Sequence, residues 1–78
     1  MVTVRLFAAA AEAARTEQTE VAAATVGELR DRLVQAHGGG LERVLRQCAI
    51  VVAGTRSDDD AAIAPGATVD VLPPFAGG

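Results

Sequence analysis

Hydrophobic and polar residues alternate in some segments of this chain and recur at helical spacing in others. From Val2 to Phe7, apolar residues alternate with Thr3 and Arg5, a pattern typical of a strand with one buried face. Gln18 to Ala23 predicts a second strand, and Thr68 to Leu72 alternates into a last one. The run from Cys48 to Ala53 is continuously apolar, which favours a central strand buried on both faces.

The segment from Thr25 to His37 predicts the main helix. Thr25 is a good N-cap, and Glu28 three residues later completes a capping box that satisfies unpaired backbone N–H groups. The helix then shows an apolar stripe at helical spacing, made of Val26, Leu29, Leu33 and Val34. The run Gly38-Gly39-Gly40 is expected to end it, since glycine readily takes the left-handed conformation.

Shorter elements and turns complete the pattern. The alanine-rich segment from Ala8 to Arg15 favours a helix of about two turns. Leu41, Val44 and Leu45 suggest one more short helical turn. Gly54 marks a turn after the apolar run, and Pro65-Gly66 marks another before the last strand. The polar segment between these turns is expected to be a loop, with at most a short strand at Ala62-Ile63.

This order of elements indicates an α+β fold, with a mixed sheet of four or five strands packed on one main helix. The chain has 78 residues, no internal repeat and no linker, so we expect one domain over residues 1–78. Half of its residues are hydrophobic, but 17 of those are alanine, and the core must be built from the remaining larger side chains.

Charge and cysteine content exclude several classes of function. The net charge is −3, which argues against nucleic-acid binding, because that function needs a basic surface. All seven cationic residues are arginine, so the chain offers no lysine for a Schiff base or a phosphate loop. A single cysteine excludes an internal disulfide. With no leader pattern and no apolar run long enough to span a membrane, we expect a soluble cytoplasmic protein without membrane partners.

The sequence offers almost none of the usual combinations of catalytic side chains. A Cys/His pair needs hydrogen-bond contact and an orienting group, and His37 and Cys48 lie in different predicted elements. We interpret Cys48 as a buried thiol, His37 as a surface residue near a helix C-terminus, and Ser57 as a loop residue without a nearby base. The run Asp58-Asp59-Asp60 lacks a calcium-loop pattern, so we expect a solvated loop or an acidic contact for a partner's arginines. We therefore predict no enzyme, no metal site and no bound cofactor.

The C-terminal segment 73–78 is the exception. It reads Pro73, Pro74, Phe75, Ala76, Gly77 and Gly78. The prolines favour an extended course, so we expect a flexible tail that leaves the sheet and reaches roughly 20 Å at ~3.3–3.6 Å per residue. The last three residues are thin enough to enter a narrow channel of another protein. The carboxylate of Gly78 is unreactive by itself and becomes useful only if a partner activates it, for example as an acyl-adenylate.

The ending Leu72-Pro73-Pro74-Phe75-Ala76-Gly77-Gly78 resembles that of the small subunit of molybdopterin synthase, the MoaD family of MoaD/ThiS-like ubiquitin-like sulfur carriers. The order of the other elements agrees with that family along the whole chain. The resemblance implies a β-grasp fold. Two features depart from the family's usual pattern, namely Gly66-Ala67-Thr68-Val69 before the last strand and the bulky Phe75.

The resemblance also implies a cycle of sulfur transfer. An E1-like, MoeB-type enzyme would use ATP to adenylate the Gly78 carboxyl, and a sulfurtransferase would supply the sulfur that converts it to a thiocarboxylate. Docked in a MoaE-type large subunit, the tail would give its sulfur to cyclic pyranopterin monophosphate in molybdenum cofactor biosynthesis. The catalytic residues would belong to the partners. Apolar residues on the exposed sheet face would form the docking surface, with Phe75 near the root of the tail.

Three alternatives remain open from the sequence. A sulfur carrier for thiamin-thiazole or cysteine biosynthesis would share the fold and the Gly77-Gly78 ending, although Pro73-Pro74 favours the molybdopterin branch. A ubiquitin-like protein modifier would join Gly78 to lysines of other proteins. A plain binding module would use no chemistry at Gly78.

Overall fold

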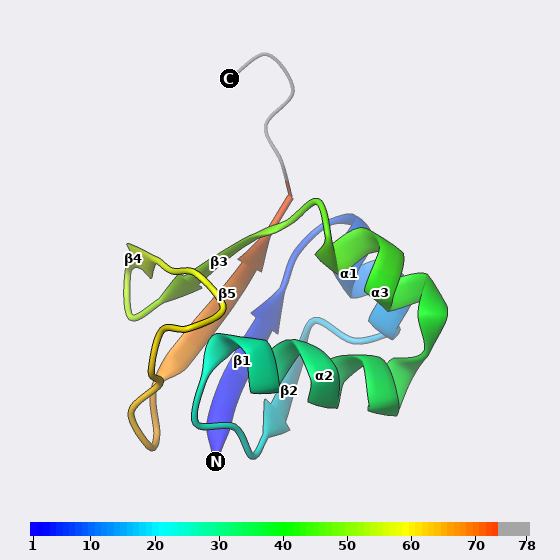
Figure 1. Ribbon diagram of the computed structural model, residues 1–78. Helices are drawn as coiled ribbons and strands as arrows, with labels where there is room; N and C mark the ends of the chain where they lie inside the picture. The colour runs from blue at the N-terminus through cyan, green and yellow to red at the C-terminus, as the bar shows by residue number, and fades with distance from the viewer. Residues whose placement is uncertain (74–78) are drawn as a thin grey trace.

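The computed structural model describes residues 1–73, and its five strands form a single mixed sheet. The strands are β1 (Val2–Leu6), β2 (Gln18–Val21), β3 (Ala49–Val52), β4 (Thr55–Arg56) and β5 (Thr68–Leu72), arranged in the order β2-β1-β5-β3-β4. β5 lies in the middle, parallel to β1 and antiparallel to β3. β1 pairs antiparallel with β2, and β3 with β4. This is the mixed α+β sheet that the sequence predicted and the β-grasp, ubiquitin-like fold that the family resemblance implied (Figure 1).

Three helices lie on one side of the sheet (Figure 1), where the sequence predicted one main helix and two short helical segments. They are α1 (Ala9–Ala14), α2 (Val26–His37) and α3 (Gly39–Leu45). At the start of α2, the backbone N–H of Glu28 donates to Thr25 Oγ1 at 3.2 Å. The Glu28 carboxylate accepts from the N–H of Ala24 at 2.7 Å, one residue before the N-cap. The predicted capping box therefore forms, but the Glu28 side chain accepts from the residue before the N-cap and not from the N-cap itself.

The three glycines at positions 38–40 do not all serve to end α2. Gly38 ends α2 with φ +89°, and its N–H donates to Val34 O at 2.7 Å. Gly39 and Gly40, however, begin α3, which extends over seven residues instead of one turn. The difference follows from packing, because Leu41 and Leu45 are fully enclosed in the core and hold this second helix in place despite the weak propensity of glycine.

Because apolar and polar residues alternate along β1 and β5, the side chains on one face of each strand lie in the core. Val2, Val4 and Leu6 of β1 and Val69 and Val71 of β5 are at most 2% exposed. They pack against the helices in a core whose buried residues, among those described, are all apolar or cysteine. The core is therefore confined to the helix-covered face of the sheet.

Two strand predictions need correction. The Cys48–Ala53 run forms β3 over Ala49–Val52, but only Ile50 within that strand is fully buried, because no layer formed by residues 1–73 covers the other face of the sheet. β4 was not expected at all. It forms because Ala53 and Gly54 both take positive φ, +49° and +87°, as a two-residue hairpin turn requires. Ala62 makes only an isolated bridge to Thr25, and Ile63 belongs to no strand.

Candidate functional site: the open sheet face and the root of the tail

The predicted carrier tail begins where the middle strand ends. β5 is paired on both sides, with β1 and β3, up to Val71; Leu72 pairs only with Ala49 of β3, and Pro73 follows directly. Pro73 has no N–H and cannot extend the ladder, which explains why the strand stops there. The remaining predicted tail residues, Pro74, Phe75, Ala76, Gly77 and Gly78, lie outside the described residues.

The sheet face away from the helices, here called the open face, is lined by side chains that alternate with the core residues. One row of five runs across all strands in the pairing register, in the order Gln18, Arg5, Asp70, Val51 and Arg56. This central row carries two arginines and one carboxylate, a formal +1 within a chain of net charge −3. Glu20, which pairs with Thr3 on the same face, balances this excess, so the strand residues of the open face carry no net charge.

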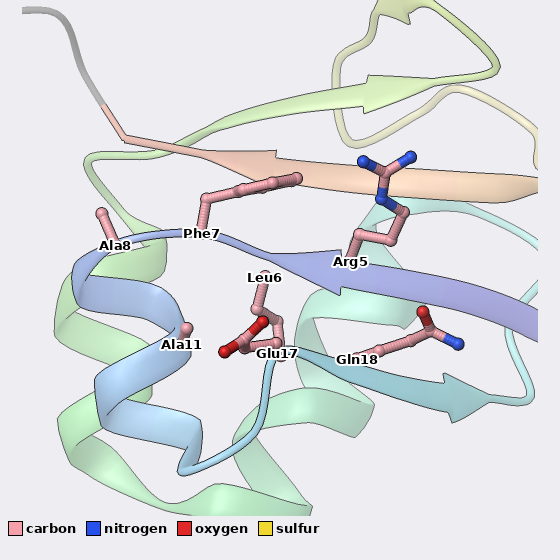
Figure 2. Close-up of a pocket in the computed structure, with 7 residues that line it drawn as sticks. All are labelled: Arg5, Leu6, Phe7, Ala8, Ala11, Glu17 and Gln18. Atoms are coloured by element: carbon pink, nitrogen blue, oxygen red, sulfur yellow. The ribbon is translucent and has the colours of Figure 1, made fainter.

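Arg5 is held from two sides within the central row. Its Nε lies 3.5 Å from Asp70 Oδ1 on the neighbouring strand, and its guanidinium carbon lies 5.4 Å from the centre of the Phe7 ring. The Arg5 side chain is nevertheless 51% exposed. Arg5 and Phe7 project to one side of β1 and Leu6 to the other (Figure 2). The ring and the carboxylate therefore fix a guanidinium that still faces solvent.

Asp70 is the acidic member of the row. Its Oδ1 is buried and has no hydrogen-bond partner among the described residues, so its contact with Arg5 is electrostatic rather than a hydrogen bond of good geometry. Leaving a carboxylate oxygen without a donor is unfavourable, and Arg5 is the cation that offsets this in the described chain. Asp70 therefore holds Arg5 in place, and Arg5 in turn neutralises Asp70.

The end of the open face nearest the tail is apolar. Ala49 pairs directly with Leu72, and both are half-buried. Phe7 follows Leu6, which pairs with Val71, so its half-buried ring lies at this same end of the sheet. Phe7, Ala49 and Leu72, here called the apolar end, are half-buried apolar residues of the face on which the resemblance implies a docking surface.

A shallow hollow adjoins Arg5 and Phe7 at the corner between β1, β2 and α1 (Figure 2). Its volume is about 380 Å³, and its lining residues are Arg5, Leu6, Phe7, Ala8, Ala11, Glu17 and Gln18. Ala8 enters it with φ +53° and ψ −126°, a backbone conformation that residues with a Cβ adopt at a cost. The hollow is open to solvent and is lined by one cationic residue, Arg5, and one acidic residue, Glu17. By itself it indicates no particular small ligand.

Cys48 lies in the bend between α3 and β3, beside the position of Pro73 in the register, and is 8% exposed. Burial raises the pKa of its thiol, and the positive charge of Arg30 opposes this in part. A raised pKa keeps the thiol protonated and reduces its reactivity. The interpretation of Cys48 as a buried thiol is confirmed, although it precedes β3 instead of lying within it.

The other candidate residues are not brought together. His37 ends α2, and Ser57 follows β4, where its hydroxyl donates to Thr55 O at 2.9 Å. Within residues 1–73, no group of three or more acidic, histidine or cysteine side chains could hold a metal ion. No helix of this part of the chain is long and apolar enough to cross a bilayer.

The aspartate run has an internal role that the sequence did not reveal. Arg30 of α2 donates from Nε to Asp59 Oδ1 and from Nη1 to Leu45 O, both at 2.8 Å. The backbone N–H of Gly27 also donates to Asp59 O at 2.9 Å. Asp59 therefore fastens the loop to α2, while Asp58 and Asp60 are exposed as expected.

Sequence reasoning missed the contact between Arg5 and Asp70. Alternation already placed both residues opposite the core face of their strands. Their contact depends on the parallel pairing of β1 with β5, which joins segments more than sixty residues apart. Sequence spacing alone carries no signal for that pairing.

The comparisons agree with this architecture. The chain matches the ThiS family over residues 4–78. No curated protein sequence matched it. Among solved structures, the SAMP1 protein of Haloferax volcanii is 32% identical, with a TM-score of 0.83 over 99% of this chain and 98% of its own.

Two further structures were solved as complexes. The BexX/CysO complex of Amycolatopsis orientalis contains a chain 25% identical, with a TM-score of 0.84 and full coverage of both chains. The complex of subunits 1 and 2 of molybdopterin-converting factor from Helicobacter pylori contains a chain 29% identical, with a TM-score of 0.71 over 99% of this chain and 97% of that one. The family match and these structures span several branches of ubiquitin-like proteins, and the chain belongs to the ThiS family.

Proposed function

We propose that this protein carries sulfur as a thiocarboxylate on Gly78 and, as a subunit of a molybdopterin synthase, donates it to cyclic pyranopterin monophosphate. The observation that carries the proposal is the position of Pro73, from which the predicted tail segment 73–78 starts. It follows the strand that is held on both sides in the middle of the sheet, next to the apolar end of the open face. A rigid root of this kind lets a docked partner direct the following residues into its own active site.

The chemistry needs no catalytic side chain from the carrier. ATP reacts with the Gly78 carboxylate to give a glycyl adenylate and pyrophosphate. Hydrosulfide then attacks the acyl carbon, AMP leaves with the bonding pair of the acyl C–O bond, and loss of the S–H proton leaves the thiocarboxylate. Where the nucleophile is instead the persulfide of a sulfurtransferase, an acyl disulfide forms, and a thiol then reduces its S–S bond to release the thiocarboxylate and a disulfide. Adenylation is required because the carboxylate is unreactive at neutral pH. The ATP and the catalytic groups would be bound by the MoeB-type enzyme, and the sulfur supplied by a sulfurtransferase.

The apolar end supports docking to a large subunit. Phe7, Ala49 and Leu72 offer half-buried apolar surface beside the tail, where a partner can add contact area without breaking the core. The structure of the H. pylori complex shows that a chain of this fold associates with a second molybdopterin-converting subunit in that species. We extend this association to a MoaE-type partner here, with Pro73 and Pro74 favouring the molybdopterin branch.

A second candidate function, protein modification, is favoured by one observation. The 32% identity to SAMP1 of H. volcanii, a small archaeal modifier protein, is higher than the identity to the molybdopterin subunit. In that case an amine of a target protein would attack the adenylate, and an amide would form with release of AMP. Carriers for thiazole or cysteine synthesis share the same first step, and they differ only in the acceptor of the sulfur.

The test is an intact-mass measurement after incubation with a MoeB-type enzyme, ATP and a sulfide source. The proposal predicts a mass gain equal to replacing one oxygen by one sulfur, located at Gly78. Adding the MoaE-type subunit and pyranopterin should then return the original mass and yield molybdopterin. Sulfur loading without transfer to pyranopterin would reject the molybdopterin branch. The absence of loading, with an enzyme active on its own carrier, would reject the carrier function with this enzyme.

A further inference from the structure

The outer edge of β2 presents its main chain to solvent, because no strand of residues 1–73 pairs with it (Figure 1). The Leu6 N–H donates to Glu17 O at 2.9 Å, so these two residues form a hydrogen-bonded pair of the β1–β2 ladder. Such pairs alternate along an antiparallel ladder, and the N–H and C=O groups of Gln18 and Glu20 therefore point away from β1. Both residues are exposed. They are the positions at which a further strand could join the sheet.

A hydroxyl already occupies one of these two positions. Thr16 Oγ1 donates to Gln18 O at 2.8 Å and accepts from the Gln18 N–H at 3.3 Å. One side chain thus bonds both outward groups of Gln18. The outward groups of Glu20 receive no such bond from a side chain within residues 1–73.

The opposite edge of the sheet, β4, is too short to need this protection. The Ser57 N–H donates to Ile50 O at 2.8 Å, directly after the pairing of Val51 with Arg56. By the same alternation, Arg56 is the one residue of β4 whose main-chain groups point away from β3. An edge strand with a single outward residue offers too few hydrogen bonds to hold another strand. Of the two edges of the described sheet, β2 is therefore the one through which the sheet can be extended.

The outward groups of β2 match those of a second copy of the same strand. Two β2 strands related by a two-fold axis at Thr19 run antiparallel, with Gln18 of each copy opposite Glu20 of the other. Each of these two pairs makes two main-chain hydrogen bonds. Threonine faces threonine at the axis, which is a favourable cross-strand pair. In this register Glu20 faces an uncharged amide and Glu17 faces Val21, so no like charges lie opposite each other.

We propose that the outer edge of β2 is an interface for a second copy of this chain, and that the Thr16 hydroxyl keeps it closed. Each of the four inter-copy hydrogen bonds has a Gln18 group at one end. Pairing of the parent protein breaks two Thr16 bonds in each copy and forms four new bonds, so it gains none. Without the hydroxyl, the same four bonds form and none is broken. The contact is independent of the chemistry proposed for Gly78, because the outer edge of β2 lies two strands away from β5.

The test is sedimentation equilibrium of the full-length parent beside Thr16→Val, Thr16→Ser and Thr55→Val. Thr16→Val keeps the shape of the side chain and removes the hydroxyl, whereas Thr16→Ser keeps the hydroxyl. Thr55→Val makes the matched change on β4, where the Thr55 hydroxyl has no hydrogen bond within residues 1–73. We expect Thr16→Val to dimerise at least about tenfold more tightly than the parent, because it gains the four bonds. Thr16→Ser and Thr55→Val should sediment as the parent does.

Two further variants separate strand pairing from other causes of association. Thr16→Ala removes the hydroxyl without adding the apolar surface of valine, and it should dimerise as Thr16→Val does. Glu20→Pro, added to Thr16→Val, removes the outward N–H of Glu20 and leaves the ladder to β1 intact, since proline is tolerated where an edge N–H faces solvent. The double variant should return to the monomer.

Hydrogen exchange tests the contact in the parent protein, where no variant has to fold. The Gln18 amide should exchange more slowly than the Glu20 amide, although both point outward, because Thr16 bonds only the first. In Thr16→Val, the Glu20 amide should exchange more slowly at high protein concentration than at low concentration. Equal exchange of the two amides in the parent would show that Thr16 does not hold Gln18, and the inference would fail.

The sedimentation results decide the remaining part of the proposal. If Thr16→Val and Thr16→Ala are folded by circular dichroism and as monomeric as the parent, the edge is not an interface for a second copy. If the dimer of Thr16→Val persists after Glu20→Pro is added, the copies meet through another surface and the inference is wrong. It is also wrong if the parent dimerises and Glu20→Pro alone abolishes that dimer, because the hydroxyl then does not close the edge.

Discussion

The two faces of the sheet are built from alternate residues of the same strands, but they differ in almost every physical property. The helix-covered face is apolar, with side chains such as Val4 and Leu6 at most 2% exposed. The open face carries the ion pair between Arg5 and Asp70, flanked by half-buried apolar side chains. The first face supplies the stability of a small domain, whereas the second remains available to partners. A chain of this size thus separates folding from recognition across the thickness of one sheet.

The largest contrast should appear when leucine is shortened in the core under the helix-covered face and on the open face. Leu33→Ala removes a fully enclosed side chain of α2 and should lower the free energy of unfolding by about 2–5 kcal/mol. Leu72→Ala on the open face removes a half-buried side chain, and the expected loss is about 1 kcal/mol. Urea unfolding measures both. Equal losses would show that the open face is as tightly packed as the core.

Arg30→Ala tests a polar contact on the helical side. The substitution removes two hydrogen bonds of 2.8 Å, to Leu45 O and to Asp59, and should lower the free energy of unfolding by about 1–3 kcal/mol. Asp59→Asn keeps an acceptor for Arg30 and serves as the control, with a smaller expected loss. If Arg30→Ala unfolds at the same urea concentration as the parent, the contact has no structural importance.

Ala8→Gly should stabilise the protein. Ala8 has φ +53° with ψ −126°, which glycine adopts freely, and it is also the N-cap of α1, where glycine is preferred to alanine. We expect a gain of about 1 kcal/mol in the free energy of unfolding. The neighbouring Ala9→Gly, inside α1, should instead lower it by roughly 0.5–1 kcal/mol. Destabilisation by both variants would contradict the assigned backbone conformation of Ala8.

The smallest effect concerns Cys48. Its raised pKa means that the folded protein keeps the thiol protonated, while the unfolded chain ionises at a lower pH, near the ordinary value of 9.0. The unfolded state then binds fewer protons, so stability should fall as the pH rises from that value through the folded pKa. Cys48→Ala should lose this alkaline decline and about 1 kcal/mol of stability, and it should retain sulfur transfer. Lost transfer in a folded Cys48→Ala protein would assign the thiol a role in the relay.

Local patterns predicted much of this fold and little of its surface geometry. Thr68–Leu72 forms a strand with the predicted bounds, and Thr25 caps α2 as expected, because alternation and capping act between near neighbours. β4 was missed because two polar residues carry no periodicity, and its formation depends on the hairpin turn at Ala53 and Gly54. The pair Arg5–Asp70 was missed because it depends on which strands become neighbours.

Deletion of Gly78 tests the central claim most directly, because it separates the folded domain from the working group. Unfolding by urea and sulfur loading by intact mass are measured on the same preparation, beside the parent and a variant with one residue added after Gly78. We predict the same unfolding midpoint for all three proteins and sulfur loading of the parent alone. A shortened or untrimmed extended protein that still gains sulfur would contradict the claim that the Gly78 carboxyl carries it.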